Sequence, residues 1–300
     1  MAGGEPETAP PPRSNLSPLR SVASILPWLA AGAAFLVLFA APIEDTVRLW
    51  LTDADASHGL LLVPVAVVLA WRRGLVPAGR EQPLIGLAML AAAVLLRYVG
   101  GLATERFAMR LSLLLAILGL IVYLRGSRQV VRWWLPASLV LLAMPLPEIL
   151  LGTLALPLQL QASRLGAWLL ETRDVPVRLA GNVIQLPGHR LFVTEACSGL
   201  RSMSALLAVG LLIGGLWLKS SWARCALVVA ALPVAVLLNG IRIFLTGFAV
   251  FYVDPALGEG LMHYSEGVAM FVVALGVLGG LACLLTLMEG SRPQPVPLPS

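Results

Sequence analysis

Residues 225–253 decide the fold of this chain, and they read CALVVAALPVAVLLNGIRIFLTGFAVFYV. The run holds 29 residues with a single charged side chain, Arg242, whereas a helix that crosses a bilayer needs about 20 mostly apolar residues. Its apolar residues are continuous rather than alternating, which favours a membrane helix over a strand of a membrane barrel. The stretch therefore indicates a protein whose main solvent is the lipid bilayer.

The composition of the whole chain supports the same class. Hydrophobic residues make up 58% of the 300 residues and charged residues only 12%, with a mean hydropathy of +0.87. Soluble domains carry about 25% charged residues, so this composition excludes a soluble globular protein, and the hydrophobicity excludes a disordered one. The net charge of +5 comes from arginines at the ends of apolar runs, which is typical of cytoplasmic loops rather than of nucleic-acid binding. The chain has no metal-ligand spacing and no phosphate loop, so we expect no nucleic-acid partner, metal or cofactor.

We predict an all-α polytopic membrane protein with about eight transmembrane helices and a small extracytoplasmic β-hairpin-like loop. The predicted spans are residues 25–43, 57–71, 84–103, 107–124, 133–150, 202–218, 225–253 and 267–288. Residues 150–170 are apolar as well but carry Gln159, Ser163 and Arg164, so we expect an interfacial or re-entrant segment there and leave a further span as the alternative.

The domain organisation follows from these spans. We expect a flexible cytoplasmic tail over residues 1–24, one transmembrane domain over 25–288 and a short cytoplasmic tail over 289–300. Arginines gather after the second, fourth and sixth spans, so the positive-inside rule predicts that both termini face the cytoplasm. Residues 172–194 then lie outside, and their Gly181-Asn182 and Pro187-Gly188 pairs predict a small hairpin with a solvated His189.

Ionisable side chains near helix interiors cost roughly 2.5 to 3.5 kcal/mol on insertion scales, so each one needs a reason. Three groups stand out: Cys197 with Glu195, Ser198 and Arg201; Asn239 with Arg242; and His263. Arg242 lies 17 residues beyond Cys225, or about 25 Å along a helix that climbs outward. The topology therefore predicts that Cys197, Arg242 and His263 share one outer layer.

A thiol, a guanidinium and an imidazole in one layer are the groups that cysteine acyl transfer requires. A neighbouring cation lowers the pKa of a thiol and increases the thiolate available to attack a peptide carbonyl. Histidine can carry the proton to the leaving amine, and the donors of arginine can stabilise the thiolate or an oxyanion. These residue types point to a membrane-embedded cysteine peptidase or transpeptidase.

Structural roles and two other functions compete with this interpretation. Arg242 can snorkel to the outer surface or pair with Asp254, and His263 can be an interface residue at a helix start. For His58 a structural hydrogen bond and a catalytic role stay open, while Cys225 and Cys283 read as small membrane-buried residues.

The first functional alternative is a non-enzymatic permease or lipid-handling protein, with a polar cavity lined by Arg242, His58 and His263. The second, weaker alternative is an intramembrane serine protease with Ser198 as the nucleophile, although the Gly-x-Ser-x-Gly elbow of hydrolases is missing.

The motifs taken together resemble the exosortase and archaeosortase family of membrane cysteine transpeptidases. The matching stretches are residues 57–59 with Pro64, 144–147, 195–202, 239–243, and His263 with Gly267, in the family's order. The resemblance implies that Cys197 is the nucleophile, that Arg242 stabilises charge and that His263 is the third catalytic residue. Glu195, Ser198, Arg201, Asn239 and His58 are candidates for supporting roles.

The resemblance also implies the partners and the location. Family members are thought to process exported proteins that carry a C-terminal sorting tail, made of a signature such as Pro-Glu-Pro, a transmembrane helix and a basic cluster. The acyl group would pass through a thioester to an amine-bearing acceptor or to water, near the outer face of the bacterial inner membrane. Such proteins often accompany exopolysaccharide systems.

Overall fold

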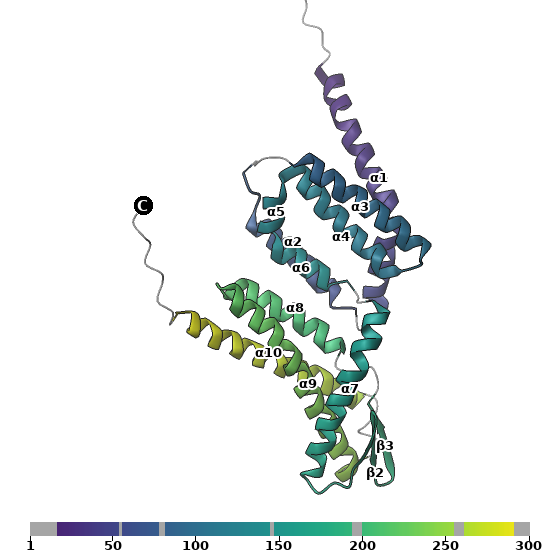
Figure 1. The fold of residues 1–300 in the computed structure, drawn as a ribbon, viewed down its shortest axis with the longest axis vertical. Coiled ribbons are helices and arrows are strands. Elements are labelled where there is room, and N and C mark those ends of the chain that lie inside the picture. Colours follow the sequence, from purple (N-terminus) through teal and green to yellow (C-terminus); the bar gives the residue numbers. More distant parts are fainter. Residues whose placement is uncertain are drawn as a thin grey trace, which may run out of the picture.

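The computed structural model describes residues 17–53, 56–77, 82–144, 147–193, 200–254 and 261–290 (Figure 1). The helices are α1 (Ser17–Thr52), α2 (Gly59–Arg73), α3 (Pro83–Leu102), α4 (Arg106–Arg125), α5 (Ser127–Arg132), α6 (Trp134–Leu142), α7 (Glu148–Glu171), α8 (Leu200–Trp217), α9 (Ser221–Tyr252) and α10 (Leu261–Gly290). The strands are β1 (Arg178–Ala180), β2 (Val183–Leu186) and β3 (His189–Phe192). The prediction of an all-α polytopic membrane protein is therefore confirmed.

Five of these helices are long and apolar enough to cross a membrane within the described part of the chain. They cover residues Leu26–Thr52, Pro83–Leu102, Arg106–Arg125, Ser221–Tyr252 and Val268–Glu289, and α8 is a shorter apolar helix. Their large exposed hydrophobic side chains, such as Val37 at 80% and Leu84 at 82%, face outward because lipid, rather than water, surrounds them. The chain is thus a multi-pass membrane protein.

Two predicted spans have different limits in the structure. The first helix continues past Ile43 to Thr52, so Glu44 and Asp45 lie within α1 and not in an outer loop. The predicted span 133–150 is wrong as one helix, because α6 ends at Leu142 and α7 begins at Glu148. Pro145 and Pro147 lie between the two helices in the sequence, and a proline disfavours helical backbone in the residue before it.

The segment expected to be interfacial or re-entrant forms one continuous helix, α7, which packs along α9 and is not among the five described helices that are long and apolar enough to cross a membrane. A Cβ on Gly166 would lie 2.5 Å from Ile243, and a Cβ on Gly247 would lie 2.8 Å from Leu170. The contacts advance in the same direction on both helices, so α7 and α9 run parallel. Both helices therefore end beside the sheet, as Figure 1 shows.

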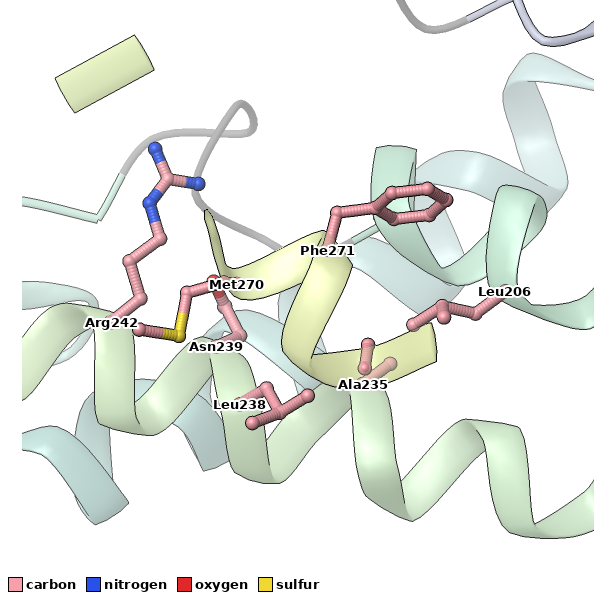
Figure 2. Close-up of a pocket in the computed structure, with 8 residues that line it drawn as sticks. Leu206, Ala235, Leu238, Asn239, Arg242, Met270 and Phe271 are labelled. Atoms are coloured by element: carbon pink, nitrogen blue, oxygen red, sulfur yellow. The ribbon is translucent and has the colours of Figure 1, made fainter. Parts of the chain in front are cut away.

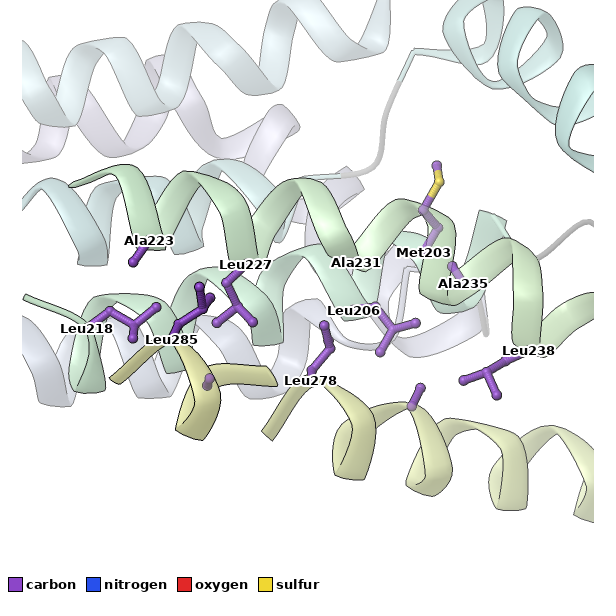
Figure 3. Close-up of a cluster of buried hydrophobic side chains, with 12 residues drawn as sticks. Met203, Leu206, Leu218, Ala223, Leu227, Ala231, Ala235, Leu238, Leu278 and Leu285 are labelled. Carbon is purple, nitrogen blue, oxygen red and sulfur yellow. The ribbon is translucent and has the colours of Figure 1, made fainter. Parts of the chain in front are cut away.

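Helices α8, α9 and α10 pack antiparallel around the main hydrophobic core (Figure 3). Gly210 of α8 lies against Val228 of α9, and Gly214 lies against Arg224, so α8 and α9 run antiparallel. The α8–α9 turn is tied to α10, because the Glu289 carboxylate accepts hydrogen bonds from the backbone N–H groups of Lys219 (3.0 Å) and Ser220 (2.7 Å). The three helices thus have a fixed register.

The sheet is an antiparallel meander in the order β1-β2-β3. The turns fall at Gly181 and Gly188, whose φ values of +64° and +78° suit glycine. The predicted hairpin is confirmed and extended by one strand, β3, on which His189 is exposed as expected. Ile184 and Leu186 of β2 bury their side chains with Ile243 and Val250 of α9, which fixes the sheet on the end of that helix.

The first half of the chain contains a buried ion pair that could not be predicted from the sequence. Arg110 of α4 donates to one carboxylate oxygen of Asp45 through Nη2 (2.6 Å) and Nε (3.1 Å). The side chain of Arg110 is only 6% exposed and that of Asp45 is 32% exposed. Asp45 therefore neutralises a cation that α4 would otherwise bury, and the pair joins α1 to the α3–α4 hairpin.

Candidate functional site

The predicted site residues are described to different extents. Cys197, Glu195 and Ser198 lie outside the described residues, between β3 and α8. The backbone of Arg201 belongs to α8 and the backbone of His263 to α10. Arg242, Asn239 and His58 are described with their side chains.

A small cavity lies where α8, α9 and α10 meet, and it contains both polar residues of the Asn239–Arg242 motif (Figure 2). Its volume is about 40 Å³. The lining residues are Leu206, Ala235, Leu238, Asn239, Arg242, Met270, Phe271 and Ala274. Figure 2 shows Arg242, Asn239 and Met270 at one end and Leu206 and Phe271 at the other, so one end is polar and the other apolar.

Asn239 and Arg242 share one face of α9 because residues three apart on a helix are neighbours. Asn239 is only 6% exposed and Arg242 is half-buried. Arg242 lies 21 residues after Ser221, the first residue of α9, which is about 32 Å along the axis. This distance is close to the thickness of the hydrocarbon core of a bilayer, which is about 30 Å. Arg242 lies toward the end of α9 on which the sheet packs.

The register of α10 brings His263 to nearly the same depth as Arg242. Met270 and Asn239 line the same cavity. Glu289 lies 19 residues after Met270 and accepts a hydrogen bond from Ser220, which lies 19 residues before Asn239, so the antiparallel register of α10 and α9 is constant. His263 lies seven residues before Met270, so its backbone is at the depth of Thr246, which lies seven residues after Asn239. The axial separation between His263 and Arg242 is four residues, or about 6 Å.

The start of α8 reaches the same layer. Because Gly210 lies against Val228 in an antiparallel pair, Leu200, the first residue of α8, is about level with Asn239. Cys197 precedes Leu200 by three residues in the sequence. The helices that carry Arg242 and His263 and the helix that follows Cys197 thus meet at one end of the bundle.

His58 belongs to a different contact. Its Nε2 lies 3.2 Å from the carbonyl oxygen of Leu142, and the indole Nε1 of Trp50 donates to the neighbouring carbonyl of Ala143 (2.8 Å). Both side chains therefore satisfy carbonyl groups at the end of α6, which have no partner within the helix. Among the residues that the structure describes, His58 is not part of the cavity lining that holds Asn239 and Arg242.

Gly59, next to His58, has a steric reason to be glycine. A Cβ at this position would lie 2.2 Å from the indole Nε1 of Trp50. The motif at residues 57–59 thus holds Trp50 in place against the end of α6, which is a structural role.

The cavity also contains residues that sequence reasoning missed. Met270 and Phe271 were overlooked because an apolar residue within an apolar helix carries no signal of its own. The spacing offered one clue, since Met270 follows His263 by seven residues and so recurs on the same helix face.

Gly240 sets the distance between α7 and α9 beside the cavity. A Cβ on Gly240 would lie 2.5 Å from Cδ2 and 2.9 Å from Cβ of Leu165. Of the two glycine pairs in the last helices, Gly214-Gly215 lies in close packing, with an added Cβ on Gly215 only 2.6 Å from Leu135, whereas Gly279-Gly280 has no described atom within 4 Å of an added Cβ.

We expect Gly240→Ala to lower the free energy of unfolding by about 1–3 kcal/mol, because α7 must move away from α9. Gly276→Ala is the matched control, since it adds the same methyl group to a neighbouring helix where no described atom lies within 4 Å. Both variants can be measured by SDS-induced unfolding in micelles. Equal effects of the two substitutions would show that α7 does not pack on Gly240.

One of three comparisons with known proteins found a match. The family described as "Transmembrane exosortase" matches residues 50–280. Neither the curated proteins nor the solved structures gave a match. The match begins just before α2 and ends within α10, so it includes every candidate site residue. Because it spans well over half of the 300 residues, the chain belongs to the transmembrane exosortase family, whose membership supports a membrane transpeptidase-type role.

Proposed function

We propose that this protein is a membrane-embedded cysteine peptidase or transpeptidase in which Cys197, Arg242 and His263 form the active site. The single observation that carries the proposal is the common depth of Arg242, the backbone of His263 and the start of α8. Consecutive Cα atoms are 3.8 Å apart, so the Cα of Cys197 lies within about 11 Å of the Cα of Leu200. The described parts of this site, namely Arg242, the backbone of His263 and Leu200, lie at the sheet end of the bundle and support the proposal.

The proposed reaction needs no group from outside the chain and its substrates. The Cys197 thiolate attacks a peptide carbonyl, so that a C–S bond forms while the carbonyl oxygen takes the negative charge. Arg242 stabilises this charge, and His263 delivers a proton to the departing amine as the C–N bond breaks. An amine or a water molecule then attacks the thioester and gives a proton to His263, so that a new C–N or C–O bond forms while the C–S bond breaks and the thiolate is released.

The proposed substrates are exported proteins with a C-terminal sorting tail in which a short signature precedes a transmembrane helix. The distance of about 32 Å along α9 between Ser221 and Arg242 supports this class, because it matches the thickness of the hydrocarbon core, at whose face the signature of such a tail emerges. The proposed location is the inner membrane, with both termini in the cytoplasm and the active site near the outer face. The acceptor is an amine or water.

The cavity that holds Asn239 and Arg242 is small. Its volume of about 40 Å³ accommodates a few water molecules, whereas pockets for small molecules measure about 300–1,000 Å³. A permease or lipid-handling protein would therefore need another path for its solute, and the reactivity of Cys197 separates the two functions.

The proposal predicts a reactive thiol at Cys197. Once Cys225 and Cys283 are replaced by alanine, Cys197 is the only thiol in the chain. We expect iodoacetamide to modify it at pH 7 about tenfold faster than a model thiol, because a nearby cation increases the thiolate fraction. Measuring the alkylation rate between pH 5 and 10 by mass spectrometry tests this prediction.

Arg242→Gln should slow the alkylation of Cys197 at pH 7 toward the rate of the model thiol, while Arg125→Gln, at the far end of α4, should leave it unchanged. If Cys197 reacts no faster than the model thiol while Arg242 is intact, Cys197 is a structural residue and the permease alternative is favoured.

A further inference from the structure

A second group of arginines lies at the end of the bundle opposite to the sheet. Arg73 ends α2, Arg132 ends α5 and Arg224 lies in the first turn of α9; we call these residues the arginine cluster. The guanidinium carbons of Arg73 and Arg224 lie 5.6 Å and 5.4 Å from the ring centroid of Trp134. Two cations thus stack on one indole and lie within about 11 Å of each other.

Arg132 is joined to this pair through the backbone. Arg73 Nη1 donates to the carbonyl oxygen of Arg132 (2.9 Å), and Arg132 Nε donates to the carbonyl oxygen of Arg73. Arg224 Nε donates to the carbonyl oxygen of Leu218 (2.9 Å). Each guanidinium therefore uses one N–H group to satisfy a carbonyl of the described structure, and a guanidinium has five such groups.

No carboxylate neutralises the cluster within the described part of the chain. None of its guanidinium nitrogens lies within 4.0 Å of a described carboxylate oxygen. Glu289 lies at the same end of the bundle, but its oxygens are occupied by the backbone N–H groups of Lys219 and Ser220. Like charges held this close repel one another, so an anion that enters the cluster would lower the energy of the protein.

The surface around the cluster is apolar and suited to acyl chains. The exposed fractions are 82% for Trp71, 70% for Val131 and 55% for Trp217, and these residues adjoin the arginine-bearing ends of α2 and α5 and the α8–α9 turn. Tryptophan is enriched at the boundary between headgroups and acyl chains. A ligand that satisfies both the cations and this surface has an anionic head and long apolar tails.

We propose that Arg73, Arg132 and Arg224 bind the phosphate of an anionic phospholipid beside Trp134. Basic pockets between transmembrane helices are suited to such headgroups, and guanidinium groups match phosphate oxygens with paired donors. The lipid would tie α9 to the ends of α2 and α5, which Arg73 and Arg132 already join to each other. It would also stabilise the start of α9, the helix that carries Arg242 at its far end.

Native mass spectrometry of the full chain tests the proposal, with phosphatidylglycerol as the probe and phosphatidylcholine as the zwitterionic comparison. We expect retention of phosphatidylglycerol but not of phosphatidylcholine. Arg132→Gln and Arg224→Gln should each weaken the retention about fivefold, and the two together more strongly. Arg125→Gln, which removes an exposed arginine from the end of α4, is the matched control and should have no effect.

Further measurements distinguish a phospholipid from free phosphate as the ligand of the arginine cluster. Arg132→Lys keeps the charge but loses the planar fork, so it should retain more lipid than Arg132→Gln. If millimolar inorganic phosphate displaces phosphatidylglycerol, the cluster is a site for free anions and the lipid assignment is overturned. Equal retention of the two lipids by the wild-type protein overturns it as well, without any variant. The readout is binding and not catalysis, so it is independent of the proposed peptidase activity.

Discussion

Replacing Cys197 by alanine is expected to stop the cleavage of a substrate that carries a C-terminal sorting tail. The loss should reach about 10⁴-fold or more, because without the nucleophile the remaining groups act only through binding and charge stabilisation. Cleavage can be followed in membranes by the change in mass of a tagged substrate. The variant should insert and unfold like the wild-type protein, since a thiol and a methyl group differ little in size.

Ser198→Ala is the matched comparison for this experiment. It changes the adjacent residue and removes at most a supporting hydroxyl, so processing should fall by no more than about tenfold. If Ser198→Ala abolishes cleavage while Cys197→Ala retains it, the protein is an intramembrane serine protease. If both variants process the substrate fully, the cysteine mechanism is wrong.

The second large effect is expected from Asp45→Ala. This substitution leaves Arg110 buried at 6% exposure without its carboxylate partner, and uncompensated buried charges cost roughly 3–5 kcal/mol. We expect the free energy of unfolding to fall by about 3 kcal/mol, the lower end of this range, because Asp45 itself is 32% exposed. SDS-induced unfolding in micelles measures the loss.

Glu44→Ala provides the control on the same helix. Glu44 pairs with Arg48 at 3.0 Å, but both side chains are more than 70% exposed, so the pair should contribute about 0–1 kcal/mol. The double variant Asp45→Ala with Arg110→Leu should recover much of the loss, because it removes the buried charge as well as its partner. A similar small effect of Asp45→Ala and Glu44→Ala would show that Arg110 is not buried.

The long helices could be predicted from the sequence because a continuous apolar run is a local property. The predicted span 84–103 corresponds to α3 (Pro83–Leu102), and 107–124 corresponds to α4 (Arg106–Arg125). The end of α1 could not be predicted, since Asp45 reads as the start of a loop until its partner Arg110, 65 residues away, is known. Likewise, the packing of α7 along α9 could not be predicted, because it depends on the close contacts of α7 with Gly240 and Gly247.

Only part of the candidate site could be predicted from the sequence. Asn239 and Arg242 could be identified from the sequence because they interrupt an apolar run, and the structure places both in the cavity wall. Met270 and Phe271 could not, because their role depends on the register of α10 against α9. The roles of Cys197 and His263 stay predictions, which the cleavage and alkylation experiments address.

The length of α9 has a consequence for the distance between the cleavage point of a substrate and its membrane anchor. This helix measures about 48 Å, which is several turns longer than the hydrocarbon core is thick, and the sheet packs on its C-terminal part. If Cys197 is the nucleophile, the scissile bond of a tethered protein is held at a fixed height above the lipid. Substrates whose spacer between the cleavage point and their own anchor is lengthened by a few residues should then escape processing, whatever their signature.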